Sequence, residues 1–203
     1  LALLEERGEV GQVEWKAVGV VLGEVGGSFV FAWEGGVDPL GGQAVLLYGE
    51  PRLTRDIDIT LGVDTGCLDE ILDLAGELSL RALPDDVKEF ALQTMVLPCL
   101  HEKTGIRVDF IFSFTPYETQ AIQRANKIEI LETEVCFASP EDVNHKIFAG
   151  RPRDREDARS ILLRSDNLDI SYIRSWLDEF DMSSEEKGFR KSFEELMGSG
   201  LNI

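Results

Sequence analysis

The chain has 203 residues, of which 43% are hydrophobic and 29% charged, and its formal net charge at pH 7 is −18. This composition is typical of a globular protein with one sizeable core, or of a catalytic domain with a helical extension. The acidic surplus argues against broad, non-specific nucleic-acid binding, which needs many basic groups to neutralise phosphates, but it leaves room for a local RNA site or for a basic partner protein.

Residues 1–37 show no regular pattern. The runs Val18–Leu22 and Phe29–Trp33 could be strands, but glycines interrupt the segment repeatedly. Further on, Gly41 and Gly42 precede the apolar run Gln43–Tyr48, which predicts one or two helical turns that end near Gly49. Two glycines before a helix let the backbone approach a ligand closely, and the free amides there favour phosphate.

The run Arg52-Leu53-Thr54-Arg55-Asp56-Ile57-Asp58 follows. On a strand, Asp56 and Asp58 project from one face, because alternate side chains point the same way. Two adjacent carboxylates repel, so they favour a hard divalent cation such as Mg²⁺ or Mn²⁺. The alternative is that both form the solvated face of an edge strand. A metal and nucleotide site is favoured because a phosphate-binding Gly-Gly, the Arg52 cation and the Thr54 hydroxyl precede the two acids closely in the sequence.

The middle of the chain alternates helical and strand patterns. Apolar spacing predicts a helix over Cys67–Leu80, and Met95–Leu100 with Ile106–Phe112 predicts a hairpin across residues 102–105. Asp109 is the one acid in the second of these strands, where packing alone does not call for a carboxylate. It either belongs to a site or pairs with Arg107. Two further short strands are expected at Ile128–Leu131 and Val135–Phe137.

From residue 139 onward the pattern is helical. Ser139 as N-cap, Pro140 at the first helical position and acids in the first turn mark a helix start. We predict four helices here: Pro140–Ala149, Asp154–Leu163, Ile170–Phe180 and Glu185–Met197. The helix Ile170–Phe180 carries an apolar stripe that is more typical of a core than of a ligand site. We therefore expect a core at residues 1–138 and a helical C-terminal region at residues 139–203.

Several polar residues of this second half have open roles. Lys146 lies two turns into the first predicted helix, where it is either a site residue or an exposed lysine. Asp154 and Asp157 share one helix face, and the sequence does not decide between capping, pairing with arginines and orienting Lys146. Five arginines form either a basic patch or a face paired with neighbouring acids. They are Arg151, Arg153, Arg155, Arg159 and Arg164.

The cysteines, histidines and hydropathy restrict the class of protein. Three scattered cysteines without metal-binding spacing are typical of reduced thiols in a cytoplasmic protein. Only His101 and His145 are histidines, which excludes a histidine-rich zinc site. No apolar stretch approaches the roughly 20 residues that span a bilayer, and no signal-peptide pattern is present. We expect a cytoplasmic location and no membrane partner.

The run from Gly41-Gly42 to Asp56-Ile57-Asp58 resembles the signature of the DNA polymerase beta-like nucleotidyltransferase superfamily. In detail it is similar to the AbiEii toxin nucleotidyltransferases. The resemblance implies an α/β (α+β) fold with a small mixed sheet flanked by helices, and Asp109 as a third carboxylate on a neighbouring strand. Residues 139–159 resemble the later motifs of the family, which implies that Lys146 contacts nucleotide phosphates. The segment 35–40, with Pro39 where a short strand is expected, departs from the pattern.

The resemblance implies transfer of a nucleoside monophosphate from a nucleoside triphosphate (NTP) to a hydroxyl. Asp56, Asp58 and Asp109 would hold two Mg²⁺ or Mn²⁺ ions, and Gly41 and Gly42 would cradle the phosphates with help from three further residues, Arg52, Thr54 and Lys146. An RNA 3′ end, a protein or a small molecule could be the acceptor, and an antitoxin could be a partner. The alternatives are a degenerate nucleotidyltransferase fold that only binds, and a metal-dependent phosphohydrolase or nuclease.

Overall fold

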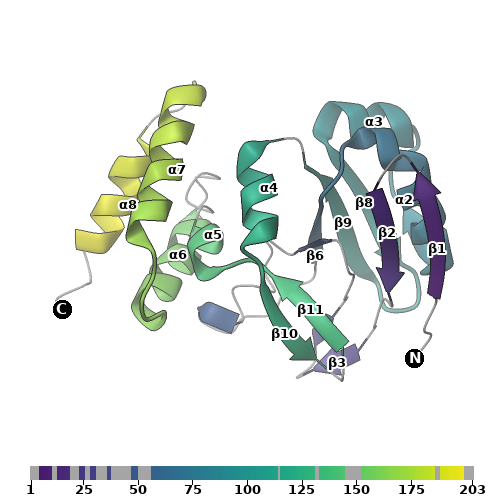
Figure 1. Ribbon diagram of the computed structural model, residues 1–203, viewed down its shortest axis with the longest axis horizontal. Coiled ribbons are helices and arrows are strands. Elements are labelled where there is room, and N and C mark those ends of the chain that lie inside the picture. The colour runs from purple at the N-terminus through teal and green to yellow at the C-terminus, as the bar shows by residue number, and fades with distance from the viewer. Residues whose placement is uncertain are drawn as a thin grey trace.

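A computed structural model gives the fold. It describes the backbone of residues 5–10, 13–18, 23–25, 28–30, 36–37, 47–49, 56–113, 115–130, 133–144, 152–185 and 188–198. Side chains are described within residues 47–49, 56–113, 115–129, 135–143, 153–185 and 188–198. The architecture is mixed α/β, with a small mixed sheet and flanking helices, as the sequence predicts (Figure 1).

The largest described sheet has five strands in the order β5-β6-β9-β8-β7. Strands β6 and β9 are parallel, and the other neighbours are antiparallel. The predicted hairpin of β8 and β9 is confirmed, and Gly105 in its turn has φ +70°, a conformation that favours glycine. The strands are β5 (Gly36–Val37), β6 (Asp56–Leu61), β7 (Leu80–Ala82), β8 (Val96–His101) and β9 (Ile106–Phe112).

One face of this sheet forms a hydrophobic core. The inward side chains of β9 are Val108, Phe110 and Phe112, each at most 1% exposed. Helix α2 (Leu68–Glu77) packs on this face together with α3 (Val87–Thr94). It confirms the predicted helix, but the predicted end at Leu80 was wrong, because Leu80 begins strand β7. A short 3-10 helix, η1 (Thr65–Cys67), leads into α2. Because alternate residues of β6 and β9 are buried in this core, the remaining residues of both strands are carried on the opposite face.

Three elements of the central region were not predicted from the sequence: β7, α3 and α4 (Pro116–Gln123). The start of α4 carries a readable signal. Thr115 caps the helix, Pro116 takes its first position, and the Glu118 carboxylate accepts the Thr115 backbone N–H at 3.0 Å, a capping box. In contrast, α3 has weak apolar periodicity, and only Ala91 is buried.

The N-terminal segment forms two hairpins, which the sequence did not predict as such. Strand β1 (Glu5–Val10) pairs with β2 (Val13–Val18), and β3 (Gly23–Val25) pairs with β4 (Ser28–Val30). The predicted bounds were wrong: β2 ends at Val18, where a strand was expected to begin, and β4 begins before Phe29. The glycines separate short strands here, since the Gly26-Gly27 pair stands between β3 and β4. The remaining residues of both predicted strands lie outside the described residues.

The predicted short strands near residue 130 are confirmed as a hairpin of β10 (Asn126–Ile130) and β11 (Thr133–Phe137). Four helices follow, as predicted, with shifted bounds. They are α5 (Pro140–Asn144), α6 (Pro152–Arg164), α7 (Ile170–Ser183) and α8 (Phe189–Gly198). Residues 145–149 of the first predicted helix lie outside the described residues.

Helix α8 begins later than the predicted Glu185, and its start has a clear physical cause. Gly188 has φ +99°, which is incompatible with a helical conformation, so α8 cannot include this residue. The Asp181 carboxylate of α7 then accepts the backbone N–H groups of Gly188, Phe189 and Arg190 at 2.6 to 3.1 Å. A side chain distant in sequence therefore caps α8, which local patterns do not reveal.

A buried carboxylate joins the helices. Asp142 of α5 is 0% exposed and accepts the hydroxyls of Ser139 and Tyr172, each at 2.7 Å. The Arg124 guanidinium lies 3.9 Å from the Tyr172 ring centroid, a cation–π contact, and Tyr117 donates to the Asp142 carbonyl. Burial raises the pKa of Asp142, and the two hydroxyl donors offset part of that shift. The cluster ties α4, α5 and α7 together.

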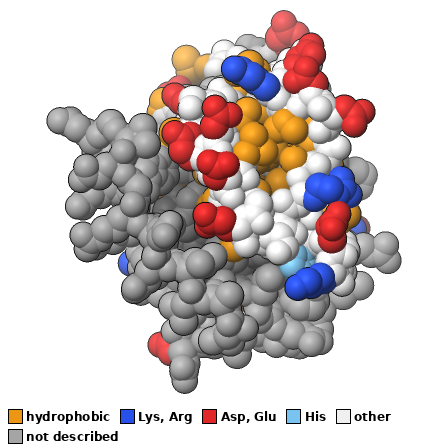
Figure 2. Space-filling view, turned by 90° about the vertical axis from the view of Figure 1, so that its right-hand side faces the viewer, with side chains coloured by type: hydrophobic (Ala, Val, Ile, Leu, Met, Phe, Trp, Pro, Cys, Tyr) orange, Lys and Arg blue, Asp and Glu red, His pale blue; other side chains and the backbone are white. Residues whose placement is uncertain are grey.

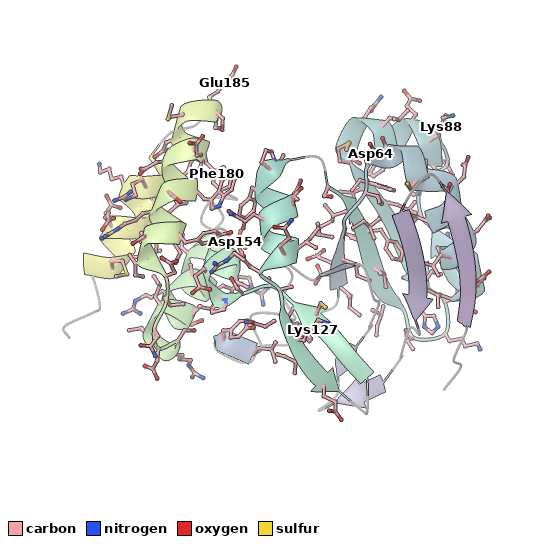
Figure 3. All side chains as sticks on the ribbon, viewed as in Figure 1. Asp64, Lys88, Lys127, Asp154, Phe180 and Glu185 are labelled. Atoms are coloured by element: carbon pink, nitrogen blue, oxygen red, sulfur yellow. The ribbon has the colours of Figure 1, made fainter. Side chains whose placement is uncertain are left out.

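The apolar stripe predicted on α7 is confirmed as core. Ile173 and Leu177 are 0% exposed, and Phe180 packs edge-on against Tyr117 of α4 at 5.2 Å (Figure 3). Tyr117 lies before position 138 and contacts residues after it, and the division of the chain at that position stays a prediction. Within the part of the chain that the structure describes, we find no helix with the length and apolar character needed to cross a membrane.

Candidate active site

The three predicted carboxylates meet on two adjacent parallel strands. Asp58 of β6 and Asp109 of β9 are register partners, and Asp56 lies one pleat away on the same face, opposite Arg107. Neighbouring strands lie about 4.8 Å apart, and residues i and i+2 of a strand lie about 7 Å apart. The pairing therefore brings Asp109 beside two acids that lie more than fifty positions earlier in the sequence.

Burial supports this assignment of faces. Ile57, Ile59 and Leu61 are at most 8% exposed and belong to the core, whereas Asp56 is exposed and Asp58 half-buried. Strand β6 is the second of five strands and not an edge strand, although β5 pairs only with its last two residues. The predicted strand with two acids on one face is thus confirmed. That these acids form a metal site stays a prediction.

Arg107 lies among the carboxylates. Its Nε donates to Asp109 Oδ1 at 2.7 Å, and the side chains are 51% and 15% exposed respectively. The hydrogen bond to Asp109 raises the pKa of Arg107, and the charges of Asp109, Asp56 and Asp58 raise it further. All three acids thus act on one guanidinium. The pairing considered in the sequence as an alternative for Asp109 is present, and it occurs within the carboxylate group.

Among the residues that the structure describes, the guanidinium of Arg107 lies beside these three carboxylates and feels the charge of each. Among the residues with described side chains, no three His, Cys, Asp or Glu side chains form a group placed to hold a metal ion. One oxygen of Asp109 is instead held by Arg107. The backbone register brings the acids together, and the side-chain conformations direct Asp109 toward Arg107.

The face of the sheet opposite the acids is buried in the hydrophobic core. Cys99 of β8 is 0% exposed in the core beneath the acids, and burial, followed by the charge of Asp109, raises the pKa of its thiol to about 12. A thiol with this pKa stays protonated at neutral pH, so Cys99 serves packing and supplies no thiolate nucleophile. The expectation of free thiols is met by all three cysteines.

The other predicted site residues cannot be placed. Gly41, Gly42, Arg52, Thr54 and Lys146 lie outside the described residues. Nearby, Leu47 and Tyr48 are helical and Gly49 lies in a bend, in agreement with the helix predicted to follow the two glycines. The roles of these five residues stay predictions.

Two acids of open role are now located. Asp154 and Asp157 on α6 are 4% and 6% exposed, and Asp154 lies within the helical group (Figure 3). Buried carboxylates of this kind are held by partners. Arg155 of the same helix lies 3.8 Å from Glu195 of α8, and Arg164 donates to the Gly49 carbonyl, so these two arginines have protein partners.

The sequence did not indicate Arg107 as a site residue, and it did not indicate the hollow that lies beside the acids. Arg107 stands two positions before Asp109 on a strand, and that spacing alone places both on one face. The hollow, of about 540 Å³, is lined by residues of α3 and of the turn before it, by Pro98 of β8 and by Arg107 of β9. No local pattern could have indicated it, because its walls come from segments that only tertiary structure brings together.

The class of fold is a small mixed α/β sheet with three acids on two adjacent parallel strands. The model of the AbiEii family, described as nucleotidyl transferase AbiEii toxin of a type IV toxin–antitoxin system, matches residues 41–158. This match covers more than half of the chain, so the protein belongs to the AbiEii nucleotidyl transferase toxin family. The resemblance noted in the sequence is confirmed.

Two further comparisons complete this result. A crystal structure of an antigenic nucleotidyltransferase-like protein from Paracoccidioides brasiliensis is similar, with 16% identity, coverage of 78% of each chain and a TM-score of 0.46. At this level of similarity, nothing about function carries over to this chain. Among curated proteins, the search found no match.

Proposed function

We propose that this protein transfers a nucleoside monophosphate from an NTP to a hydroxyl acceptor and needs Mg²⁺ or Mn²⁺ to do so. The observation that carries the proposal is the register of Asp58 opposite Asp109 on adjacent parallel strands, with Asp56 on the same face. Membership of the AbiEii family supports the reaction class and a role as the toxin of a toxin–antitoxin pair, with an antitoxin as partner.

The chemistry of the donor set suits a hard divalent cation. Asp56, Asp58 and Asp109 offer carboxylate oxygens, which Mg²⁺ and Mn²⁺ prefer. Among the described residues, Arg107 competes with a cation for Asp109 Oδ1, and its half-exposed side chain has room to rotate into solvent and release that oxygen. When bound, divalent ions neutralise the triphosphate and lower the pKa of an attacking hydroxyl.

The chain's own residues have separate tasks in this proposal. Asp56 and Asp58 hold cations from one strand, and Asp109 adds a third carboxylate and accepts the proton of the acceptor hydroxyl. Backbone amides at Gly41 and Gly42 bind the β- and γ-phosphates. The cationic side chains of Arg52 and Lys146 add charge to the phosphate site, and the Thr54 hydroxyl adds a donor.

The test is label transfer with Asp58→Asn. The protein is incubated with Mg²⁺, each of the four NTPs labelled at the α-phosphate, and total RNA and protein. Label is expected to move to a macromolecule, and Asp58→Asn is expected to reduce its rate at least about 100-fold, since even residues that only support a metal ligand are often worth 10- to 100-fold. Asp73→Asn, an exposed acid of α2, is the matched control and should keep the wild-type rate.

Three results would contradict the proposal. Equal label transfer by wild type and Asp58→Asn would show that the carboxylates are not catalytic. Nucleotide binding without transfer to any acceptor would favour a degenerate nucleotidyltransferase fold. Shortening of the RNA, dependent on Asp58 and on Mg²⁺, would favour a nuclease.

A further inference from the structure

The hollow lined by α3, Pro98 and Arg107 lies beside Asp109. Two of its lining residues are neighbours of Asp109: Pro98 is its register partner on β8, and Arg107 is hydrogen-bonded to it. Its volume of about 540 Å³ falls within the range of about 300–1,000 Å³ that is typical of ligand sites. A molecule in this hollow is therefore placed next to the proposed reaction centre.

The strand order shows on which side of Asp109 the hollow lies. In the order β5-β6-β9-β8-β7, the lining residues Pro98 of β8 and Arg107 of β9 put the hollow on the side of β9 that faces away from β6. In phosphoryl transfer the attacking and leaving oxygens lie roughly in line on opposite sides of the phosphorus. A hydroxyl held in the hollow therefore reaches the carboxylates from the β8 side of Asp109, and a triphosphate in line with it then lies on the opposite side of the phosphorus.

The lining indicates the charge of its ligand. Asp85, Asp86 and Glu89 contribute three exposed carboxylates, and the Phe90 ring, 38% exposed, adds an aromatic surface. The cation in the lining, Arg107, is already paired with Asp109. Carboxylates beside an aromatic ring attract ammonium and guanidinium groups and repel a phosphate backbone. Acidic side chains also border an apolar patch on the face of the molecule seen in Figure 2.

We propose that this hollow binds the acceptor of the transfer, and that the acceptor is a serine, threonine or tyrosine hydroxyl on a lysine- and arginine-rich polypeptide segment. This inference rests on the function proposed above and names its acceptor. The acceptor oxygen forms a bond to the α-phosphorus, and its proton passes to the second carboxylate oxygen of Asp109. The bond between the α-phosphorus and the oxygen that bridges to the β-phosphorus breaks, and pyrophosphate leaves with that electron pair.

The binding experiment uses the full chain and a fluorescent peptide of alternating lysine and serine, followed by fluorescence anisotropy without nucleotide. The double variant Asp85→Asn/Glu89→Gln removes two charges and keeps the Glu89 acceptor for Gln93. Asp86 is left intact because it caps α3. Peptide affinity should fall about three- to tenfold, since exposed ion pairs are individually weak. The control Asp73→Asn/Glu77→Gln removes two exposed charges from α2 and should leave the affinity almost unchanged.

The transfer experiment offers the peptide and total RNA to the same three proteins with labelled NTPs and Mg²⁺. Label should move to the peptide, and the double variant should lower the rate at subsaturating peptide by the same three- to tenfold factor. The inference is overturned by transfer to RNA alone that the double variant does not slow, by no peptide binding, or by equal losses in the control. Absence of transfer to either acceptor, with Asp58→Asn behaving like wild type, would instead overturn the proposed function, and the acceptor role with it.

Discussion

Arg107→Gln should strengthen the binding of divalent metal ions in the absence of nucleotide. In the structure, Arg107 Nε donates to Asp109 Oδ1 at 2.7 Å and so competes for one of the three carboxylates. Removing the guanidinium frees that oxygen and removes a positive charge from the place where a cation would bind. Glutamine keeps most of the side-chain length, so packing against the strand should change little.

The size of the effect follows from the exposure of the pair. Exposed salt bridges are worth about 0.2–1 kcal/mol, and hydrogen bonds to charged groups about 1.5–3 kcal/mol when protected from water. Arg107 is 51% exposed and Asp109 is 15% exposed, so this pair lies between those limits. A contribution of about 1–2 kcal/mol corresponds to a factor of about 5–30 in metal affinity.

Binding of Mn²⁺ is measured by electron paramagnetic resonance of the free ion, which does not depend on activity. Arg81→Gln is the matched control. Arg81 lies on β7, two strands from β9, is 56% exposed and forms an ion pair with Glu102 at 2.8 Å. Its Mn²⁺ affinity should stay close to that of wild type. Unchanged or weaker Mn²⁺ binding by Arg107→Gln would refute the idea that Arg107 competes with the metal.

Three further predictions concern the fold. Burial raises the pKa of Asp142 above its ordinary value of 3.8. The stability of the wild type relative to Asp142→Asn should therefore be greatest below pH 3.8 and should fall as the pH rises through the raised pKa. In urea unfolding, a relative stability that grows with pH would contradict this expectation. Thr115→Ala should cost about 1 kcal/mol by removing the cap of α4, and an unchanged urea midpoint would argue against the capping box. Phe110→Ala, at a side chain 1% exposed, should cost about 3–5 kcal/mol in the same assay, and a loss below about 1 kcal/mol would mean that the core collapses around the gap.

Much of the local structure could be predicted because its causes are local. The alternation in β6, the apolar spacing of α2 and the hairpin of β8 and β9 depend on residues that are close in sequence. The capping box at Thr115 was equally local and could have been read. The start of α8 could not, because Asp181 caps it from the preceding helix.

The sequence by itself determined that Asp56 and Asp58 share a strand face, that Asp109 stands in a β-rich run, and that the chain resembles the AbiEii family. Tertiary structure alone decided that β6 and β9 pair in parallel with Asp58 opposite Asp109, and that Arg107 lies among the acids. It also decided that residues of α3, β8 and β9 line a hollow beside Asp109. The physical reason is that strand order and register come from burying the core face of the whole sheet, a condition that no short segment satisfies alone.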